Sequence, residues 1–577
     1  NTPWYRPTRV NHVIDGSDFG WRTGTGKFMD YCSDTFGTVV DVGPGSPTGV
    51  CFGYGAKFPA KYQNAFFISD WSYGKLYAVH LTPKGSSYVG KVEEFASAQP
   101  FPLTDLLINP KDGAMYIAVG GRKVQSGIYR VTYTGNESTA PANSIPGGEV
   151  ARKRRQALEN FVQKGVKPAN PKQLNQIWSA LGAQDRGIRH AARVALEKQP
   201  VKNWKNKLSS EKNPVVASAA MIALARADGK SSDAVLSKAM SMDYANEKNW
   251  QQRIDLLRSI TLALTRGGHP QPEQKKKLIE WLDKIYPAVT PEENRDLSAL
   301  MQFLQAPSAA KKGMALLRSG SGQEEQIGYA LNLRHLKTGW TSMLRESYFK
   351  WFVRAGSFKG GARLSNYLDG IKKDAIASVE DWQMTEGLKK IIETKPQQAD
   401  PQFTFEPRTF VKNWTMKDMA PWVPSGVPGK RDFKNGRQMF GAGSCYACHR
   451  IAGEGGAVGP DLTSVGGKFG AYDLLESIVD PGKEISDQYG SSVFSLTNGT
   501  QLNGRIMNMR NNEYWVNTDM MKPSTVTKVK AENLTSIEPS SISMMPPGLI
   551  NTMDKEDILD LMAYLIAGGK SDHELFR

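Results

Sequence analysis

The sequence predicts a multidomain fold in which part of a β-propeller is followed by an α-helical solenoid and then by a mainly α domain with a β-rich insert. Three observations predict it. Short aromatic and β-branched runs fill residues 1–135, apolar residues recur at helical spacing over 151–398, and turn-rich or proline-rich stretches separate the parts. A chain of 577 residues has room for about three to five domains.

The first 135 residues have the pattern of β-structure. Runs such as "AFFISDW", "KLYAVHL", "AMYIAVGG" and "GIYRVTY" are separated by Gly, Pro, Asn and Asp. Their spacing suits the four-stranded blades of a propeller, but they supply only about three blades, whereas a closed ring needs roughly four to eight. We therefore expect the missing blades as a separate or processed chain, or an equivalent surface from a partner.

A turn-rich linker over 136–150 leads into a helical segment over 151–398. From Ile188, apolar residues fall at i, i+3, i+4 and i+7, and Asn213 with Pro214 marks the start of another helix. Small residues on the inner faces allow close stacking of helix pairs. This pattern predicts a HEAT-like α-solenoid, although the repeat length is irregular.

The C-terminal domain is expected over 431–577, after a proline-rich linker over 399–430. It should open with a helix at "RDFKNGRQMF" and close with a helix at "DKEDILDLMAYLIAG", for which Thr552 is a plausible N-cap. Between them, a β-rich insert is expected over about 488–540. Its Asn498-Gly499 dipeptide predicts a two-residue hairpin.

The sharpest motif is "GSCYACHR", in which Cys445 and Cys448 flank two residues and His449 follows. In a C-x-x-C-H motif both thiols bind a haem covalently and the imidazole binds its iron. A zinc site needs four ligands, and Cys32 and Cys51 are far upstream in no such pair. A redox dithiol would follow a strand, whereas these flanks are rich in glycine. The motif therefore favours one haem c over both alternatives.

The segments "CYACHRIAGEGGAVGPDLTSVGGKFGAYDLLESIVDPGKEISDQYGS" and "SMMPPGLINTMDKEDILDLMAYL" resemble the haem-binding domain of a family of large bacterial multidomain c-type cytochromes. Those proteins join a sugar-dehydrogenase-like β-propeller, HEAT-like repeats and a C-terminal cytochrome c domain. The N-terminal "PWYRPTRVNHVIDGSDFGWR" and "FFISDWSYGKLYAVHL" are similar to the C-terminal part of quinone-dependent sugar dehydrogenase propellers. The resemblance covers essentially the whole chain.

The resemblance implies how the iron is held. Eight methionines follow the haem motif, and the family pattern places the second axial ligand, opposite His449, immediately before a proline, which indicates Met545. Met544 and an open sixth position are the alternatives. The stretch "GAVGPDL" resembles the loop whose proline carbonyl accepts a hydrogen bond from the ligating imidazole, which indicates Pro460. By the same resemblance, the cofactor PQQ and calcium are possible in the propeller.

The remaining histidines give weaker signals. His12, with Arg6 and Arg9, could face a propeller channel and hold an anionic quinone, or could make a polar contact between blades. Four others are interpreted as packing, loop, tail or surface groups: His190, His335, His269 and His573. The catalytic residues of any dehydrogenase are unknown from the sequence.

Composition limits the class of protein further. The net charge is +16, which favours an anionic partner such as an acidic redox protein, while no recognition motif supports nucleic-acid binding. The longest apolar stretch, "VVASAAMIALA", is too short for a transmembrane segment. Covalent haem implies export to the periplasm or outside. The start "NTPWYRPTRV" lacks leader features, which suggests a processed end or a cut inside a longer precursor. In an oxidising compartment Cys32 and Cys51 could form a disulfide or stay free thiols.

The function predicted is an exported haem c electron-transfer protein. It would take electrons from a quinone-dependent sugar or alcohol dehydrogenase-like propeller, as one component of an oxidoreductase. The alternative is a scaffold that binds polysaccharide or protein and uses haem for sensing or structure. A peroxidase needs an open iron site, which "SMMPPGL" disfavours.

Overall fold

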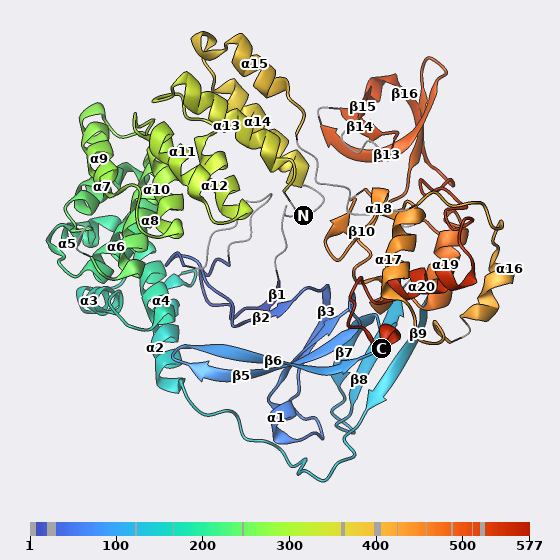
Figure 1. Cartoon of the computed structure of the whole chain (residues 1–577). Coiled ribbons are helices and arrows are strands. Elements are labelled where there is room, and N and C mark those ends of the chain that lie inside the picture. The colour runs from blue at the N-terminus through green and yellow to red at the C-terminus, as the bar shows by residue number, and fades with distance from the viewer. Residues whose placement is uncertain are drawn as a thin grey trace.

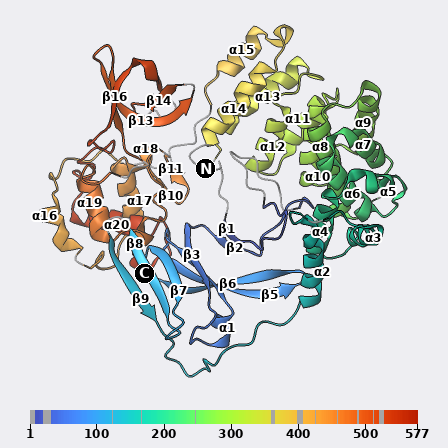
Figure 2. The ribbon, with the colours of Figure 1, turned by 180° about the vertical axis from the view of Figure 1, so that it is seen from behind.

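The computed structural model describes the chain except residues 1–6, 20–30, 122–123, 166, 245–246, 359–363, 397–405, 424, 457, 486–488, 511 and 520–525. Blue sheets lie at the base of the molecule in Figure 1, a green-to-yellow arc of helices rises from one end of them, and the orange-to-red C-terminal domain rises from the other. The view from behind in Figure 2 shows the same arrangement.

The N-terminal β region is built of antiparallel sheets. Strands β3 to β6 form a four-stranded sheet in chain order, β7 to β9 form a three-stranded sheet, and β1 pairs with β2. The bounds are Thr8–Val10 (β1), Val40–Gly43 (β2), Pro47–Phe52 (β3), Phe66–Asp70 (β4), Lys75–Lys84 (β5), Ser87–Ser97 (β6), Leu103–Ile108 (β7), Met115–Gly121 (β8) and Val124–Val131 (β9), with a short helix at Ala60–Gln63 (α1).

This arrangement differs from three complete blades, because the described residues hold two sheets and one two-stranded ribbon. The stretches that follow β1 and precede β2 turn toward the helices instead of adding strands. Asp15 offers its carbonyl oxygen to the ring of His190 at 3.3 Å, and Cys32 and Thr35 contact Arg186. No closed ring is found among the described residues, so a propeller completed by a partner stays a prediction.

The middle of the chain is helical, as predicted. The bounds are Glu149–Glu159 (α2), Pro171–Ala180 (α3), Arg186–Glu197 (α4), Lys205–Ser210 (α5), Pro214–Ala227 (α6), Ser232–Met240 (α7), Trp250–Gly267 (α8), Pro272–Ile285 (α9), Pro291–Phe303 (α10), Ala309–Ser319 (α11), Gln323–Leu333 (α12), Ser342–Ala355 (α13), Leu364–Ala377 (α14) and Glu386–Glu393 (α15). Helix α6 starts where expected, because the Asn213 side chain accepts from two backbone N–H groups and Pro214 occupies the first turn. The HEAT-like nature of these repeats stays a prediction.

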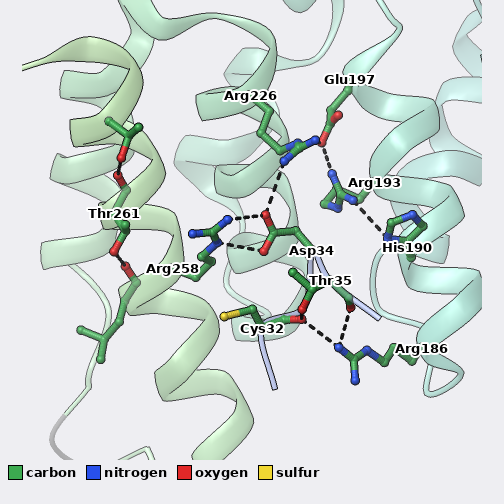
Figure 3. A network of polar contacts seen from close by, with 12 residues as sticks. Cys32, Asp34, Thr35, Arg186, His190, Arg193, Glu197, Arg226, Arg258 and Thr261 are labelled. Atoms are coloured by element: carbon green, nitrogen blue, oxygen red, sulfur yellow. Dashed lines mark hydrogen bonds and ion pairs between the residues drawn. The ribbon is translucent and has the colours of Figure 1, made fainter. Parts of the chain in front are cut away.

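A loop of the β region is inserted into the helical region (Figure 3). The Asp34 carboxylate accepts two hydrogen bonds from Arg258 of α8, both 2.8 Å long, and lies 3.4 Å from Arg226 of α6. Arg186 of α4 donates to the carbonyl oxygens of Cys32 and Thr35 at 2.8 and 2.7 Å. The two regions are therefore held together by buried, charge-assisted hydrogen bonds.

The predicted Cys32–Cys51 disulfide is not formed, since both residues are free cysteines. Cys32 is buried in the loop that packs against the helical region, and this burial raises the pKa of its thiol to about 12. Cys51 lies on β3 and packs against the apolar core of the sheets, beside residues such as Phe67. The disulfide prediction failed because the loop before β2, which carries Cys32, packs against the helices, whereas β3, which carries Cys51, packs in the core of the sheets.

The C-terminal domain is built around two crossed helices, α17 (Phe433–Ala442) and α20 (Lys555–Ile566). A Cβ atom on Gly436 would lie 2.3 Å from the carbonyl oxygen of Asp560, so glycine is what lets the helices approach so closely. The other elements are Met416–Met419 (α16), Cys445–Cys448 (α18), Arg450–Ile451 (β10), Glu454–Gly455 (β11), Ala471–Val479 (α19), Ser492–Leu496 (β12), Gln501–Arg510 (β13), Glu513–Asn517 (β14), Thr527–Lys530 (β15) and Leu534–Pro539 (β16).

Part of the expected proline-rich linker belongs to this domain. Met419 and Val423 are buried in its apolar core, and Trp414 packs against that core while its Nε1 donates to the carbonyl oxygen of Met553 at 3.0 Å. The linker prediction rested on prolines alone and ignored these aromatic and apolar residues.

The insert forms a five-stranded antiparallel sheet with the order β15-β14-β13-β12-β16 (Figure 1). The hairpin at Asn498-Gly499 is confirmed, but the Leu496 N–H donates to the carbonyl oxygen of Thr500, so the loop has three residues instead of two. Gly499 has φ +83°, which is the conformation of a hairpin closed by a bulged glycine.

The C-terminal domain contacts the β region at Gly467 and Lys468. The Phe101 N–H donates to the Gly467 carbonyl oxygen at 3.1 Å, and a Cβ atom on Gly467 would lie 2.6 Å from the carbonyl oxygen of Ser72. Beside it, the Lys468 ammonium lies 5.4 Å from the ring centre of Trp71. These contacts fix how the domain sits on the sheets.

None of the helices in the described part of the chain combines the length and apolarity required to cross a bilayer.

Candidate haem site

The three residues of the haem motif lie on one turn and its end. Helix α18 is a single turn from Cys445 to Cys448, which places the two thiols three residues apart on one face. Ser444 precedes it in a left-handed conformation, φ 54°, and His449 follows in an extended one. The turn therefore presents two sulfur atoms together and directs the imidazole away from the helix backbone.

The imidazole of His449 has one defined partner. Its Nδ1 lies 2.9 Å from the carbonyl oxygen of Pro460, which accepts the ring N–H. That bond selects the tautomer with the proton on Nδ1 and leaves the Nε2 lone pair for a metal. The structure thus places Pro460 where the sequence predicted, and its role toward iron stays a proposal.

Glycines shape the loop around this turn. A Cβ atom on Gly459 would lie 2.8 Å from Cε1 of His449, and Cβ atoms on Gly455 and Gly456 would each lie 2.3 Å from a carbonyl oxygen of the Cys445–His449 segment. The N–H groups of Val458 and Gly459 both donate to the Cys448 carbonyl oxygen, at 3.1 and 2.8 Å. The backbone wraps the motif so closely that a side chain at any of these three positions would clash with it.

Burial sets the protonation state of the three motif side chains. Burial raises the pKa of Cys445 to about 12 and also raises the pKa of Cys448, so both are neutral thiols before reaction. Burial lowers the pKa of His449, while the hydrogen bond to Pro460 opposes that change. His449 is therefore a neutral imidazole at pH 7, the form that binds iron.

The predicted second axial ligand lies in the irregular segment between β16 and α20. Met545 is partly buried there, and its N–H donates to the hydroxyl oxygen of Ser543 at 3.2 Å. Met544 beside it is partly buried as well. Met553 and Met562 are buried in the core of the domain, as expected for packing residues. Met520 and Met521 of the insert lie outside the described residues. Met545 thus keeps its place as the predicted ligand.

His12 and Arg9, which were predicted to form one cluster, contact different residues. Nδ1 of His12 lies 3.0 Å from the hydroxyl of Ser87, whereas Arg9 donates to the carbonyl oxygen of Phe19 at 2.8 Å. Arg6 lies outside the described residues. This arrangement favours the polar packing contact over a shared quinone site.

The other histidines make local contacts. His190 is buried, and the exposed His335 lies 3.7 Å from Asp374. His269 stacks on Phe303 with ring centres 4.4 Å apart, and His573 caps the last turn. Among the described residues no group of three or more His, Cys, Asp or Glu side chains could hold a metal ion, so the zinc alternative gains no further ligands.

Comparison with known families decides the class of this domain. The family model for cytochrome c matches residues 433–567, which include both crossed helices, the motif and the insert. The C-terminal domain is a cytochrome c domain. The family implies a covalently bound haem c, and the roles of Cys445, Cys448 and His449 in holding it stay a prediction. A search of curated proteins finds no match to the chain.

Some residues around the haem motif escaped sequence reasoning. Arg505 of the insert donates to the loop that carries Pro460 and stacks on Tyr489, and Lys468 lies at the contact with the β region. The glycine-rich flanks were visible in the sequence, but nothing in it indicated which arginine of the insert would reach the loop.

Proposed function

We propose that this protein is an exported electron carrier whose cytochrome c domain receives electrons from the N-terminal β region. The observation that carries the proposal is the C-x-x-C-H turn whose imidazole has Nδ1 bonded to Pro460 and Nε2 left for iron. A haem c bound here supplies a one-electron iron couple. Export to the periplasm or beyond follows from the need to attach it covalently.

The residues of the chain have separate roles in this proposal. Cys445 and Cys448 hold the cofactor, His449 and Met545 bind its iron, and Pro460 orients the imidazole. A methionine ligand raises the reduction potential, which suits an acceptor of electrons from an organic substrate.

The contact between the domains supports electron transfer within the chain. From Phe101 of the β region, a hydrogen bond leads to the Gly467 carbonyl, and the N–H of Gly467 donates to the carbonyl oxygen of Ser464. The N–H of Leu462 in turn donates at 2.7 Å to the carbonyl oxygen of Arg450, the residue after His449. These hydrogen bonds, with the chain between Leu462 and Ser464, connect the β region to the residue that follows His449.

The source of electrons is proposed from the resemblance of the β region to quinone-dependent sugar or alcohol dehydrogenases, with PQQ and calcium as the cofactors to test. Because fold does not establish function, this part depends on experiment. The net charge of +16 suits docking of an acidic protein that accepts the electrons.

The test is anaerobic. The oxidised native protein is mixed with a panel of sugars and alcohols, with and without PQQ and calcium, and haem reduction is followed optically. Reduction that needs both substrate and quinone would support the proposal. Direct chemical reduction by dithionite is the positive control. No reduction by any member of the panel, together with saturable polysaccharide binding, would favour the scaffold alternative.

A further inference from the structure

The β insert touches the haem motif through one side chain. Arg505, on strand β13, donates from Nη1 to the carbonyl oxygen of Val458 at 3.0 Å. Val458 stands two residues before Pro460, whose carbonyl oxygen accepts the Nδ1 proton of His449. A residue of the insert is therefore one short loop away from the iron ligand.

Arg505 is held firmly in this position. β13 lies between β12 and β14 in the sheet, and Arg505 is in register with the buried Asn517 of β14. The guanidinium lies 4.6 Å from the ring centre of Tyr489, which is partly buried just before β12. A planar guanidinium that stacks on a ring and donates a charge-assisted hydrogen bond loses little freedom in doing so.

The loop is thereby fixed from both sides. On one side the N–H groups of Val458 and Gly459 donate to Cys448 within the haem motif. On the other side Arg505 binds the carbonyl oxygen of Val458. Pro460 lies two residues after Val458. The direction of the Pro460 carbonyl oxygen therefore depends on how the peptide units from Val458 to Pro460 are held.

We propose that Arg505 is a positioning residue for His449: the β insert, through Arg505 stacked on Tyr489, holds the Val458–Pro460 loop and so sets the hydrogen bond of the imidazole. The inference deepens the proposed function and rests on it for the effect on haem. A firmly held Nδ1 hydrogen bond makes the imidazole a stronger donor to iron, which favours the oxidised state and lowers the reduction potential.

The sign of the potential change separates this role from a simple charge effect. Removal of a cation near the haem would favour the more positive, oxidised state and lower the potential. Loss of the Nδ1 hydrogen bond would raise it. We expect R505M to raise the potential, whereas a fall would show that only the charge of Arg505 matters and would overturn the proposal.

The main experiment measures hydrogen exchange of peptides covering residues 449–462 in the full-length protein. We expect R505M to speed exchange of the Val458 and Gly459 amides by roughly ten- to hundredfold, because hydrogen bonds to charged groups are worth about 1.5–3 kcal/mol. Y489L, which keeps the hydrogen bond and loses the stacking, should give a smaller increase, and R505K should restore part of the protection.

The matched control is K530Q, which removes one positive charge from the same sheet at a residue that pairs with Glu532 instead of the loop. It should leave loop exchange unchanged. The proposal would be overturned if the Val458 and Gly459 amides exchanged as slowly in R505M as in the wild-type protein, or if R505M and K530Q changed their exchange rates equally. Exchange can be measured with or without bound haem, whereas failure to find covalent haem would refute the proposed function alone.

Discussion

The carboxylate of Asp34 accepts two hydrogen bonds from the guanidinium of Arg258, although the residues are 224 positions apart. Their side chains are only 2% and 8% exposed. Burial alone would raise the pKa of Asp34, but the hydrogen bond and charge of Arg258, with Arg193 and Arg226 nearby, hold it below its ordinary value. The pair fastens the β region to the helices (Figure 3).

We expect R258M to open this contact at a cost of about 3–5 kcal/mol, because it removes both 2.8 Å hydrogen bonds from a buried carboxylate. Hydrogen exchange of peptides covering residues 31–39 measures the local opening free energy. The control is R130M, which breaks the exposed pair with Asp112 and should cost about 0–1 kcal/mol. An R258M effect as small as the control would contradict this view of the contact.

His190 predicts a pH dependence of stability. Burial, then the charge of Arg193, hold its pKa well below the ordinary value of 6.5. The unfolded state therefore binds a proton that the folded state does not, and stability is complete above about pH 6.5 and falls below it. The expected slope is up to about 1.4 kcal/mol per pH unit.

Hydrogen exchange of α4 peptides between pH 7 and 5, corrected for intrinsic rates, gives this slope. H190Q should flatten it, whereas H335Q changes an exposed histidine and should leave it intact. A wild-type slope in H190Q would show that groups other than His190 account for the pH dependence.

The docking of the cytochrome c domain on the sheets depends on Gly467. In G467A the new Cβ atom would meet backbone atoms of Ser72 and Tyr73 at 2.6–2.8 Å, so the interface must open. We expect faster exchange of the Phe101 amide and slower reduction of haem by any substrate of the β region. G482A, whose Cβ atom would have no neighbour closer than 3.9 Å, is the control. Unchanged exchange in G467A would show that the interface tolerates displacement.

Local patterns in the sequence predicted much of the fold. The spacing from Ile188 predicted α4, and Asn213 with Pro214 predicted the start of α6, because caps and amphipathic faces depend on near neighbours. The last helix was also predicted, but its N-cap is Asp554 instead of Thr552, since Asp554 and Asp557 form a capping box.

Contacts between distant segments could not be predicted in this way. The pairing of Asp34 with Arg258 and the reach of Arg505 to Val458 depend on how whole domains pack. The same limit explains the wrong disulfide prediction for Cys32 and Cys51. At the haem motif the spacing alone indicated the chemistry. Cys445, Cys448 and His449 lie within one helical turn and the residue after it, so their arrangement depends only on near neighbours.

The central claim is a haem c with His449 and Met545 on the iron, and the optical spectrum of M545A tests it most directly, with M544A as the control. We predict that the oxidised wild-type protein and M544A show the methionine-to-iron charge-transfer band and that M545A loses it, while all three keep the spectrum of covalently bound haem. An unchanged band in M545A, or a wild-type protein without covalent haem, would contradict the claim.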